Sequence, residues 1–314
     1  MRATSSLSRF AALLVGVAPF LANAHEGPEH EIEELTARMK VQGESADLLT
    51  ERAVEYRVMG KLTEAAADLE RAATYDGHSI AIQRELGRVL LLAGKLNEAI
   101  TATTRGLSIK SDEPADLASL RMLRAEILRA QNEHKKALED CDAGLRLHKQ
   151  NPEWYILRSD IQRRLKMHTE RLAGIEEGIK ETGAGILEIE RVEAMIDAGQ
   201  FPKALTLIEA ELADSRIKSS WLIRRAKTLF GLGKKTEGEQ DLKNALEEIE
   251  KRLNSKTPDV PLLIDKAVTL ELLDKKWDAL RAYEEARDKG AGDTLGEKIK
   301  SLQEAVRAMP VVKP

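Results

Sequence analysis

Residues 60–65 read Gly60-Lys61-Leu62-Thr63-Glu64-Ala65, and the pattern returns along the chain as Gly94-Lys95-Leu96-Asn97-Glu98-Ala99. Five further copies, each beginning with Gly or a polar residue, occupy 132–137, 166–171, 199–204, 233–238 and 274–279. The copies are evenly spaced, except for longer intervals before the third and the seventh. A recurrence at roughly 34 residues predicts a repeat architecture in which each unit is one supersecondary structure.

Each copy predicts a turn between two helices. A Gly at the first position permits the left-handed backbone that ends a helix. The small residue five positions later lets a second helix approach the first closely. In the first repeat Ala65, Leu69 and Ala72 follow at i, i+4 and i+7, which is one face of an α-helix.

The composition supports helices and excludes several other classes. Aromatic residues make up 4% and charged residues 32% of the 314 residues, which disfavours a β-sandwich or barrel. The single cysteine excludes a disulfide framework and a cysteine-rich zinc module. A net charge of −4 leaves no basic field for nucleic acid, and scarce aromatics disfavour polysaccharide scaffolding.

Over residues 46–291 the chain resembles the tetratricopeptide repeat family. The best-preserved positions are Tyr56, Gly60, Ala65, Leu69 and Ala72 in the first repeat, Leu86, Gly87, Gly94 and Ala99 in the second, and Ala267, Ala279, Tyr283 and Ala286 in the seventh. The resemblance implies an all-α, right-handed solenoid of about seven helix-turn-helix repeats. We expect these repeats at about 46–79, 80–111, 118–151, 152–184, 185–218, 219–253 and 260–291.

The sequence departs from the family pattern at several positions. Trp154 and Trp221 stand one position before the usual tryptophan of the first helix, and the closing proline is mostly absent. Arg171 and Gly238 occupy the place of the signature alanine in repeats 4 and 6.

The two flanks of the repeats have helical patterns of their own. Within residues 25–45, Ile32, Leu35 and Met39 have helical spacing, which predicts a polar tail followed by a short helix. Within residues 292–314, a stripe formed by Leu295, Ile299, Leu302 and Val306 predicts a capping helix and a tail. A solenoid needs such a cap because its last repeat would otherwise expose an apolar face.

Residues 1–24 have the pattern of a cleaved secretory signal peptide. Arg2 and Arg9 precede a twelve-residue apolar stretch, 10–21, which is too short to span a bilayer of roughly 30 Å. Ala22-Asn23-Ala24 then matches the small-x-small cleavage pattern. We expect export to the periplasm or cell exterior, with no stable membrane insertion after cleavage.

No motif predicts catalysis or a bound cofactor. Residues 231–236 resemble a phosphate-binding loop, but Lys235 separates Lys234 from Thr236 and no strand precedes them, so we interpret them as a helix-helix turn. His25 and His30 lack the spacing of a helical metal site, which favours a solvated tail, with weak copper or zinc binding as the alternative. We therefore expect no enzyme, no cofactor and no structural metal.

The family resemblance also implies a concave groove lined by the first helix of each repeat. Its groove positions fall on Arg57, Arg84, Arg88, Arg129, Arg163, Ile189, Ile223 and Phe230. Clustered arginines suit carboxylates, because the planar guanidinium pairs with two oxygens. The alternative is that these arginines are solvated residues paired with neighbouring glutamates. Val54 and Glu85 replace the two asparagines of the carboxylate-clamp subfamily, so that ligand class is not implied.

The sequence therefore favours a non-enzymatic protein-interaction scaffold that holds a segment of another exported protein, with acidic groups towards the N-terminal repeats. An assembly or maturation factor for an exported enzyme complex, such as a cytochrome, is the first alternative. An enzyme with an unfamiliar site is the second.

Overall fold

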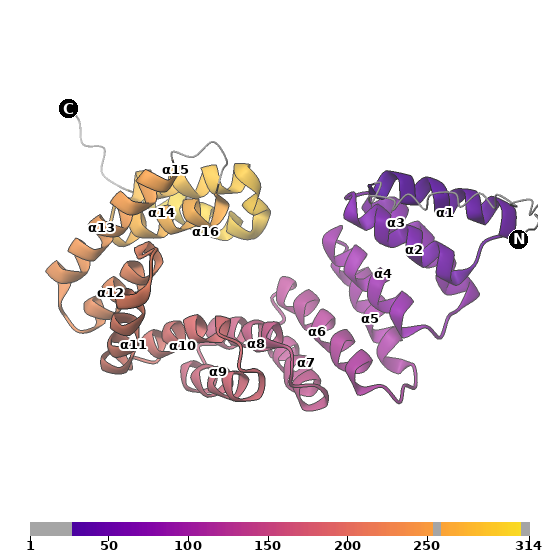
Figure 1. The fold of residues 1–314 in the computed structure, drawn as a ribbon, viewed down its shortest axis with the longest axis horizontal. Coiled ribbons are helices and arrows are strands. Elements are labelled where there is room, and N and C mark those ends of the chain that lie inside the picture. Colours follow the sequence, from indigo (N-terminus) through magenta and orange to yellow (C-terminus); the bar gives the residue numbers. More distant parts are fainter. Residues whose placement is uncertain (1–26, 254–258, 309–314) are drawn as a thin grey trace, which may run out of the picture. The chain divides into compact units, whose positions relative to one another are not determined.

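The computed structural model describes residues 27–253 and 259–308, and the part of the chain that it describes is built from helices without a β-strand (Figure 1). The expected signal peptide at 1–24, His25 and the tail at 311–314 lie outside these residues. The predicted all-α repeat fold is confirmed.

Seven consecutive helix pairs make up most of the described chain. The first helices of the pairs are α2 (Ala46–Val58), α4 (Ile80–Leu92), α6 (Pro114–Ala130), α8 (Pro152–Arg164), α10 (Ile186–Asp197), α12 (Ser219–Gly231) and α14 (Val260–Leu272). The second helices are α3 (Leu62–Tyr75), α5 (Leu96–Ser108), α7 (His134–Leu147), α9 (His168–Thr182), α11 (Phe201–Asp214), α13 (Lys235–Leu253) and α15 (Lys276–Ala286). We number the pairs as repeats 1 to 7.

The turn inside every repeat has the predicted left-handed backbone. Gly60, Gly94, Gly199 and Gly233 have φ between 71° and 76°. The other three turns use Asn132, Lys166 and Asp274, with φ of 62°, 58° and 58°. The residue after each turn donates its N–H to a carbonyl five residues earlier, as Lys61 does to Tyr56 at 2.8 Å, which stops the first helix.

Several first helices begin with a side-chain cap. Ser45, Ser79 and Asp259 accept a hydrogen bond from the backbone N–H three residues later, at 3.0–3.3 Å, and Asn151 accepts one from Glu153 at 2.9 Å. Such caps satisfy N–H groups that have no partner within the helix.

In every repeat except the fourth, which has Arg171 there, a small residue after the turn allows the close helix packing predicted for the repeats. Ala65, Ala99, Ala137, Ala204 and Ala279 are fully buried. Gly238 takes this position in repeat 6 because a Cβ there would lie 2.6 Å from Cε1 of Phe230. The phenyl ring thus fills the volume that an alanine methyl group occupies elsewhere.

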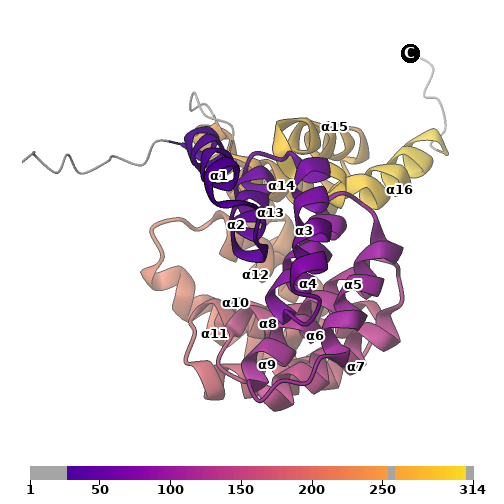
Figure 2. The ribbon, with the colours of Figure 1, turned by 90° about the vertical axis from the view of Figure 1, so that its right-hand side faces the viewer.

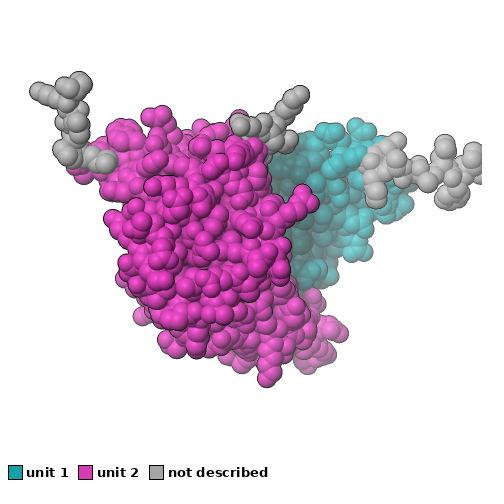
Figure 3. All heavy atoms as spheres, turned by 60° about the vertical axis from the view of Figure 1, so that its left-hand side comes forward, with its two compact units in different colours: residues 1–109 teal, residues 110–314 magenta. Residues whose placement is uncertain are grey.

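By its contacts, the chain divides into two compact units, residues 1–109 and 110–314 (Figure 3). Unit 1 holds α1 (Pro28–Gln42) and the helices of repeats 1 and 2, which Figure 2 shows from a second side. Unit 2 holds repeats 3 to 7 and α16 (Gly296–Arg307). The boundary lies just before Ser111–Pro114, the segment that separates the second and third repeats in the sequence, although Pro114 itself begins α6.

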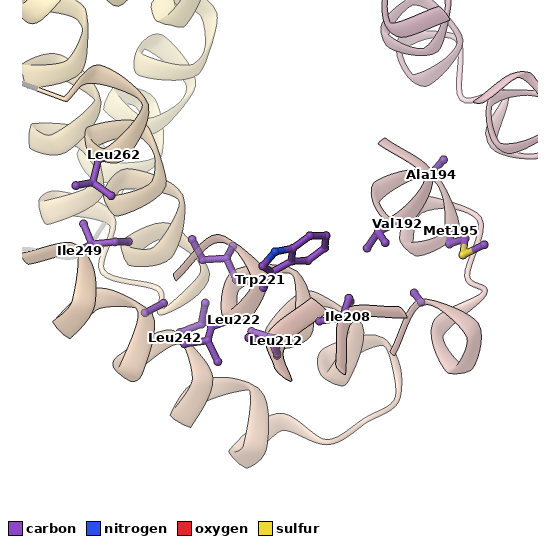
Figure 4. Close-up of a cluster of buried hydrophobic side chains, with 14 of the residues drawn as sticks. Val192, Ala194, Met195, Ile208, Leu212, Trp221, Leu222, Leu242, Ile249 and Leu262 are labelled. Carbon is purple, nitrogen blue, oxygen red and sulfur yellow. The ribbon is translucent and has the colours of Figure 1, made fainter. Parts of the chain in front are cut away.

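Apolar side chains from successive repeats join into a shared core in unit 2. Figure 4 shows Val192 of α10, Ile208 of α11, Trp221 of α12, Leu242 of α13 and Leu262 of α14 in one cluster. Because each repeat buries its apolar face against the next one, the stack is stable where a single hairpin would not be.

Helices flank the repeats on both sides, α1 before them and α16 after them. Leu35 and Met39 of α1 are buried, and α1 packs on α2. Ile299, Leu302 and Val306 of α16 join the core cluster of α14 and α15. Between α15 and α16 the backbone forms one π-helical turn, Arg287–Ala291, and one 3-10 turn, Gly292–Leu295.

Among the described residues no helix combines the length and the apolar character that a bilayer crossing requires.

Candidate functional site

In unit 1 two of the three predicted groove arginines lie around one carboxylate. Arg57 of α2 lies 3.4 Å from Glu85 of α4, and Arg88 lies 3.9 Å from the same side chain. Arg84 is half-buried on α4. Arg57 and Arg88 thus have the ion-paired arrangement that the sequence left open as the alternative.

In unit 2 three arginines share Asp160 of α8. The distances from Asp160 are 3.0 Å to Arg129 of α6, 2.6 Å to Arg163 and 3.1 Å to Arg164. Burial raises the pKa of Asp160, but the hydrogen bonds from Arg163 and Arg164 outweigh it and lower the pKa to about 2. Three cations on one anion leave this cluster positive.

The residues predicted to form the apolar half of the groove differ in their exposure. Ile189 of α10 is exposed, but Ile223 of α12 is only 4% exposed and packs in the core cluster. The assignment of Ile223 to the groove wall is therefore wrong, because its face of α12 lies against neighbouring helices. Phe230 is half-buried and packs against Gly238.

A cavity of about 650 Å³ lies among the first helices of repeats 3 to 6. Its walls come from four first helices and from α9, and Figure 1 shows these helices as neighbours in unit 2. The lining residues are Arg129, Glu153, Ile156, Leu157, Asp160, Arg163, Arg171, Glu190, Glu193, Asp197, Arg224 and Lys227. Ten of the twelve carry charge, in equal numbers of each sign, so ion pairing dominates its chemistry.

Arg171 is a buried cation of the cavity and comes from a second helix. Arg171 occupies the position that holds alanine in most repeats, and its long side chain is only 4% exposed. Its guanidinium donates to Ser159 Oγ at 2.8 Å, to Glu190 Oε2 at 3.1 Å and to Asp197 Oδ2. Because the side chain of Ser159 on α8 is small, it leaves room for the Arg171 side chain. The carboxylates of Glu190 and Asp197 on α10 neutralise the guanidinium charge.

The far end of the cavity pairs α10 with α12. Glu193 of α10 lies 3.0 Å from Arg224 and 3.3 Å from Lys227, both on α12. Arg224 also stacks over the Trp221 ring, with its guanidinium carbon 5.3 Å from the ring centroid, which orients the side chain.

Sequence reasoning missed most of the cavity lining, although a signal for it exists. Asp160, Glu193 and Lys227 follow one another at the period of the repeat, so they occupy the same position on three successive first helices. In the sequence, Arg171 stands out only as a departure from the family pattern. A long cationic side chain at a close-packing position indicates that its charged end binds a polar group nearby.

Charged groups dominate the lining of the cavity. Its lining has neither a hydroxyl or thiol nucleophile nor a histidine. Within the described residues no group of three His, Cys, Asp or Glu side chains is arranged to hold a metal. Cys141 of α7 is fully buried, and burial raises the pKa of its thiol, as expected for a small core residue.

Comparison with known proteins agrees with this architecture. Residues 59–127 match the family model of the tetratricopeptide repeat. A tetratricopeptide repeat protein from Parabacteroides merdae ATCC 43184 is similar in structure, with a TM-score of 0.62 and 18% identity over 83% of this chain and 98% of that chain. Yeast Tom70 has a TM-score of 0.53 and 17% identity over 91% of this chain and 61% of its own.

At these identities the two structures support the fold alone, and no curated protein matches the sequence. The fold is nevertheless one that supports a protein-interaction scaffold. The match at residues 59–127 and the left-handed turn in each of seven helix pairs together show that the chain has the tetratricopeptide repeat fold.

Proposed function

We propose that this protein is a non-enzymatic scaffold that holds a polypeptide segment of a partner protein in the charged cavity of unit 2. One observation carries the proposal: four successive first helices and the buried Arg171 direct charged side chains into one cavity. Charged groups from several repeats recognise a ligand that crosses those repeats, and a polypeptide has the necessary length.

The dimensions favour an extended segment. Packed helices lie roughly 8–10 Å apart, and an extended chain advances about 3.3–3.6 Å per residue. About three residues therefore cross from one first helix to the next, and a segment of about ten residues spans α6 to α12. Ile156 and Leu157 offer the only apolar contacts among the lining residues.

The surplus of positive charge around Asp160 is the place where we expect the acidic groups of the partner to bind. The side chains of Arg129, Arg163 and Arg164 are 37%, 57% and 37% exposed, so a ligand carboxylate can reach them. Guanidinium groups bind carboxylates through two parallel hydrogen bonds, which adds geometric specificity to attraction.

The proposed location is the periplasm or cell exterior, and it rests on the sequence of residues 1–24. We expect a mature chain that begins at His25. Mass spectrometry of the protein recovered from its native cells measures this directly. A mature chain that still contains Arg2 would contradict export by a cleaved signal.

Charge reversal tests the binding site. The double variant Arg163→Glu with Arg164→Glu should reduce capture of the native partner several-fold at low salt. The matched control reverses Arg146 and Arg281, two exposed arginines on α7 and α15 outside the cavity, and should capture as the unmodified protein does. Circular dichroism verifies that both variants remain helical.

Equal capture by the two double variants would refute the assignment to this cavity. Turnover of any compound by the purified protein, lost on substitution of cavity residues, would refute the non-enzymatic part of the proposal.

A further inference from the structure

The order of charge along the cavity specifies the ligand more closely. We infer that the cavity selects an extended segment with an acidic, a basic and an acidic side chain at intervals of three residues. This inference rests on the proposed function and adds the chemistry of the partner to it.

Charged side chains form three groups along the cavity, on α8, α10 and α12, which we call its first, second and third stations. The first station is basic. Asp160 is the single anion that Arg129, Arg163 and Arg164 share, at 2.6–3.1 Å. Glu153, at the start of α8, also lines the cavity. Arg164 does not line it but binds Asp160 at 3.1 Å, so Arg129 and Arg163 leave positive charge in excess over Glu153. The nearest ligand side chain should therefore be Asp or Glu.

The second station, on α10, is acidic. Glu190 and Asp197 both bind the one guanidinium of Arg171, so this group of three residues has an excess of negative charge. The two carboxylates remain 28% and 32% exposed, whereas Arg171 is buried beneath them. A ligand at this station meets carboxylate oxygens, which favours Lys or Arg.

The third station, on α12, is basic again. Arg224 and Lys227 share Glu193, and Lys227 is 31% exposed. Asp265 of α14 also interacts with these two cations, but it does not line the cavity. The side chain of a ligand at this station should be acidic.

The separation of the stations sets the spacing in the ligand. They lie on α8, α10 and α12, and neighbouring first helices of unit 2 are in contact. An interaxial distance of roughly 8–10 Å equals about three residues of a polyproline II segment, which advances about 3.1 Å per residue and directs every third side chain to the same face. The order of positive, negative and positive charge along the cavity is therefore complementary to a ligand of the form acid-x-x-base-x-x-acid.

Three labelled peptides with identical composition test the order. Each has two Glu and one Lys separated by Ala-Ser pairs, with blocked termini, and the Lys stands at the centre, at the start or at the end. Fluorescence anisotropy with the full protein at about 20 mM salt measures the dissociation constants, since screening weakens at low salt. The central-Lys peptide should bind about tenfold more tightly than either of the others.

A variant locates the preference in the cavity. Lys227→Glu makes the third station acidic and should remove most of the preference for the central Lys. Lys251→Glu is the control, because Lys251 is 73% exposed on α13 and pairs only with Glu247 among the described residues. It should leave the three dissociation constants unchanged.

The outcomes separate this inference from the proposed function. Equal binding of all three peptides, lost in the Arg163→Glu, Arg164→Glu variant, would refute the charge order and leave the scaffold role standing. Absence of measurable binding would also refute the charge order, while partner capture decides the scaffold role separately. A preference that survives Lys227→Glu would place the recognition outside this cavity.

Discussion

Repeats 3 and 4 are neighbours with the same backbone plan, yet they connect their two helices differently. In repeat 3, Arg124 of α6 donates to both carboxylate oxygens of Asp140 on α7, at 2.6 and 2.8 Å. In repeat 4, Gly174 stands where that aspartate would be, sixteen residues after Arg158. Arg158 instead donates to the Gly174 carbonyl at 3.1 Å and to Glu177 at 2.8 Å.

The signature position differs as well. Ala137 in repeat 3 is fully buried against its partner helix, whereas repeat 4 has Arg171 there. The Arg-Asp pair of repeat 3 recurs in repeats 1 and 6, as Arg52 with Asp68 and Arg225 with Asp241, also sixteen residues apart. Repeat 4 therefore departs from a recurring pattern at the point where the chain builds its cavity.

This difference shows what a helical hairpin can tolerate. A long side chain can replace the closely packed alanine when its polar end binds polar groups of the neighbouring helices. The replacement turns a packing position into a cavity-lining position. Variants of repeats 3 and 4 test how far the two repeats differ.

The largest effect is expected for Arg171→Ala, which restores the residue of repeat 3. Because Glu190 and Asp197 lose their shared cation and a void remains, the free energy of unfolding should fall by about 3 kcal/mol. Urea denaturation followed by circular dichroism measures the loss. Arg163→Ala, at a side chain that is 57% exposed, serves as the control and should cost less than about 1 kcal/mol.

A stability loss for Arg171→Ala no greater than that of the control would show that the buried network contributes little. Adding Glu190→Leu and Asp197→Ala to Arg171→Ala should recover part of the loss, since the uncompensated charges are then removed.

A smaller effect is expected from acid at Asp160. Its pKa in the folded protein, about 2, lies below the ordinary value of 3.8, so the folded state favours the carboxylate. The resulting stability is present above a pH of about 4 and is lost as the pH falls from about 4 to 2. Its size, after allowance for solvent screening, is about 1 kcal/mol.

The comparison with Asp160→Asn isolates this contribution. The difference in unfolding free energy between the two proteins should shrink as the pH falls from about 5 to 2. A difference that stays constant over this range would mean that the three arginines do not favour the ionised form.

The smallest effect is expected when repeat 4 receives the pair of repeat 3. Gly174→Asp places a Cβ 2.9 Å from Nη2 of Arg158, and this flexible end can move to bind the new carboxylate. Loss of a helical glycine and gain of the pair should stabilise the protein by about 0.5–1 kcal/mol. Thermal unfolding measures the change.

The reverse substitution in repeat 3, Asp140→Gly, is the matched counterpart and should destabilise, because Arg124 and Arg121 both lose their ion pair with Asp140. Destabilisation by Gly174→Asp would show that Glu177 and Asp142 already saturate Arg158.

The predictable parts of the site are those with local causes. The turns at Gly60 and Gly94 and the burial of Ala65 and Ala99 follow from six consecutive residues each. The position of Arg163 on a first helix follows from its distance to the turn. In contrast, register alone places Ile223 in the groove, and burial against neighbouring helices overrides that assignment.

An all-helical repeat chain follows from the amino-acid order alone, because glycine backbone freedom, small-residue packing and the regular recurrence of both act within one hairpin. Which charges meet depends instead on the folded arrangement. Arg171 reaches Asp197 across 26 residues and Arg129 reaches Asp160 across 31. Such contacts depend on how one repeat stacks on the next, and the strength of an ion pair depends on burial and distance, which no local pattern specifies.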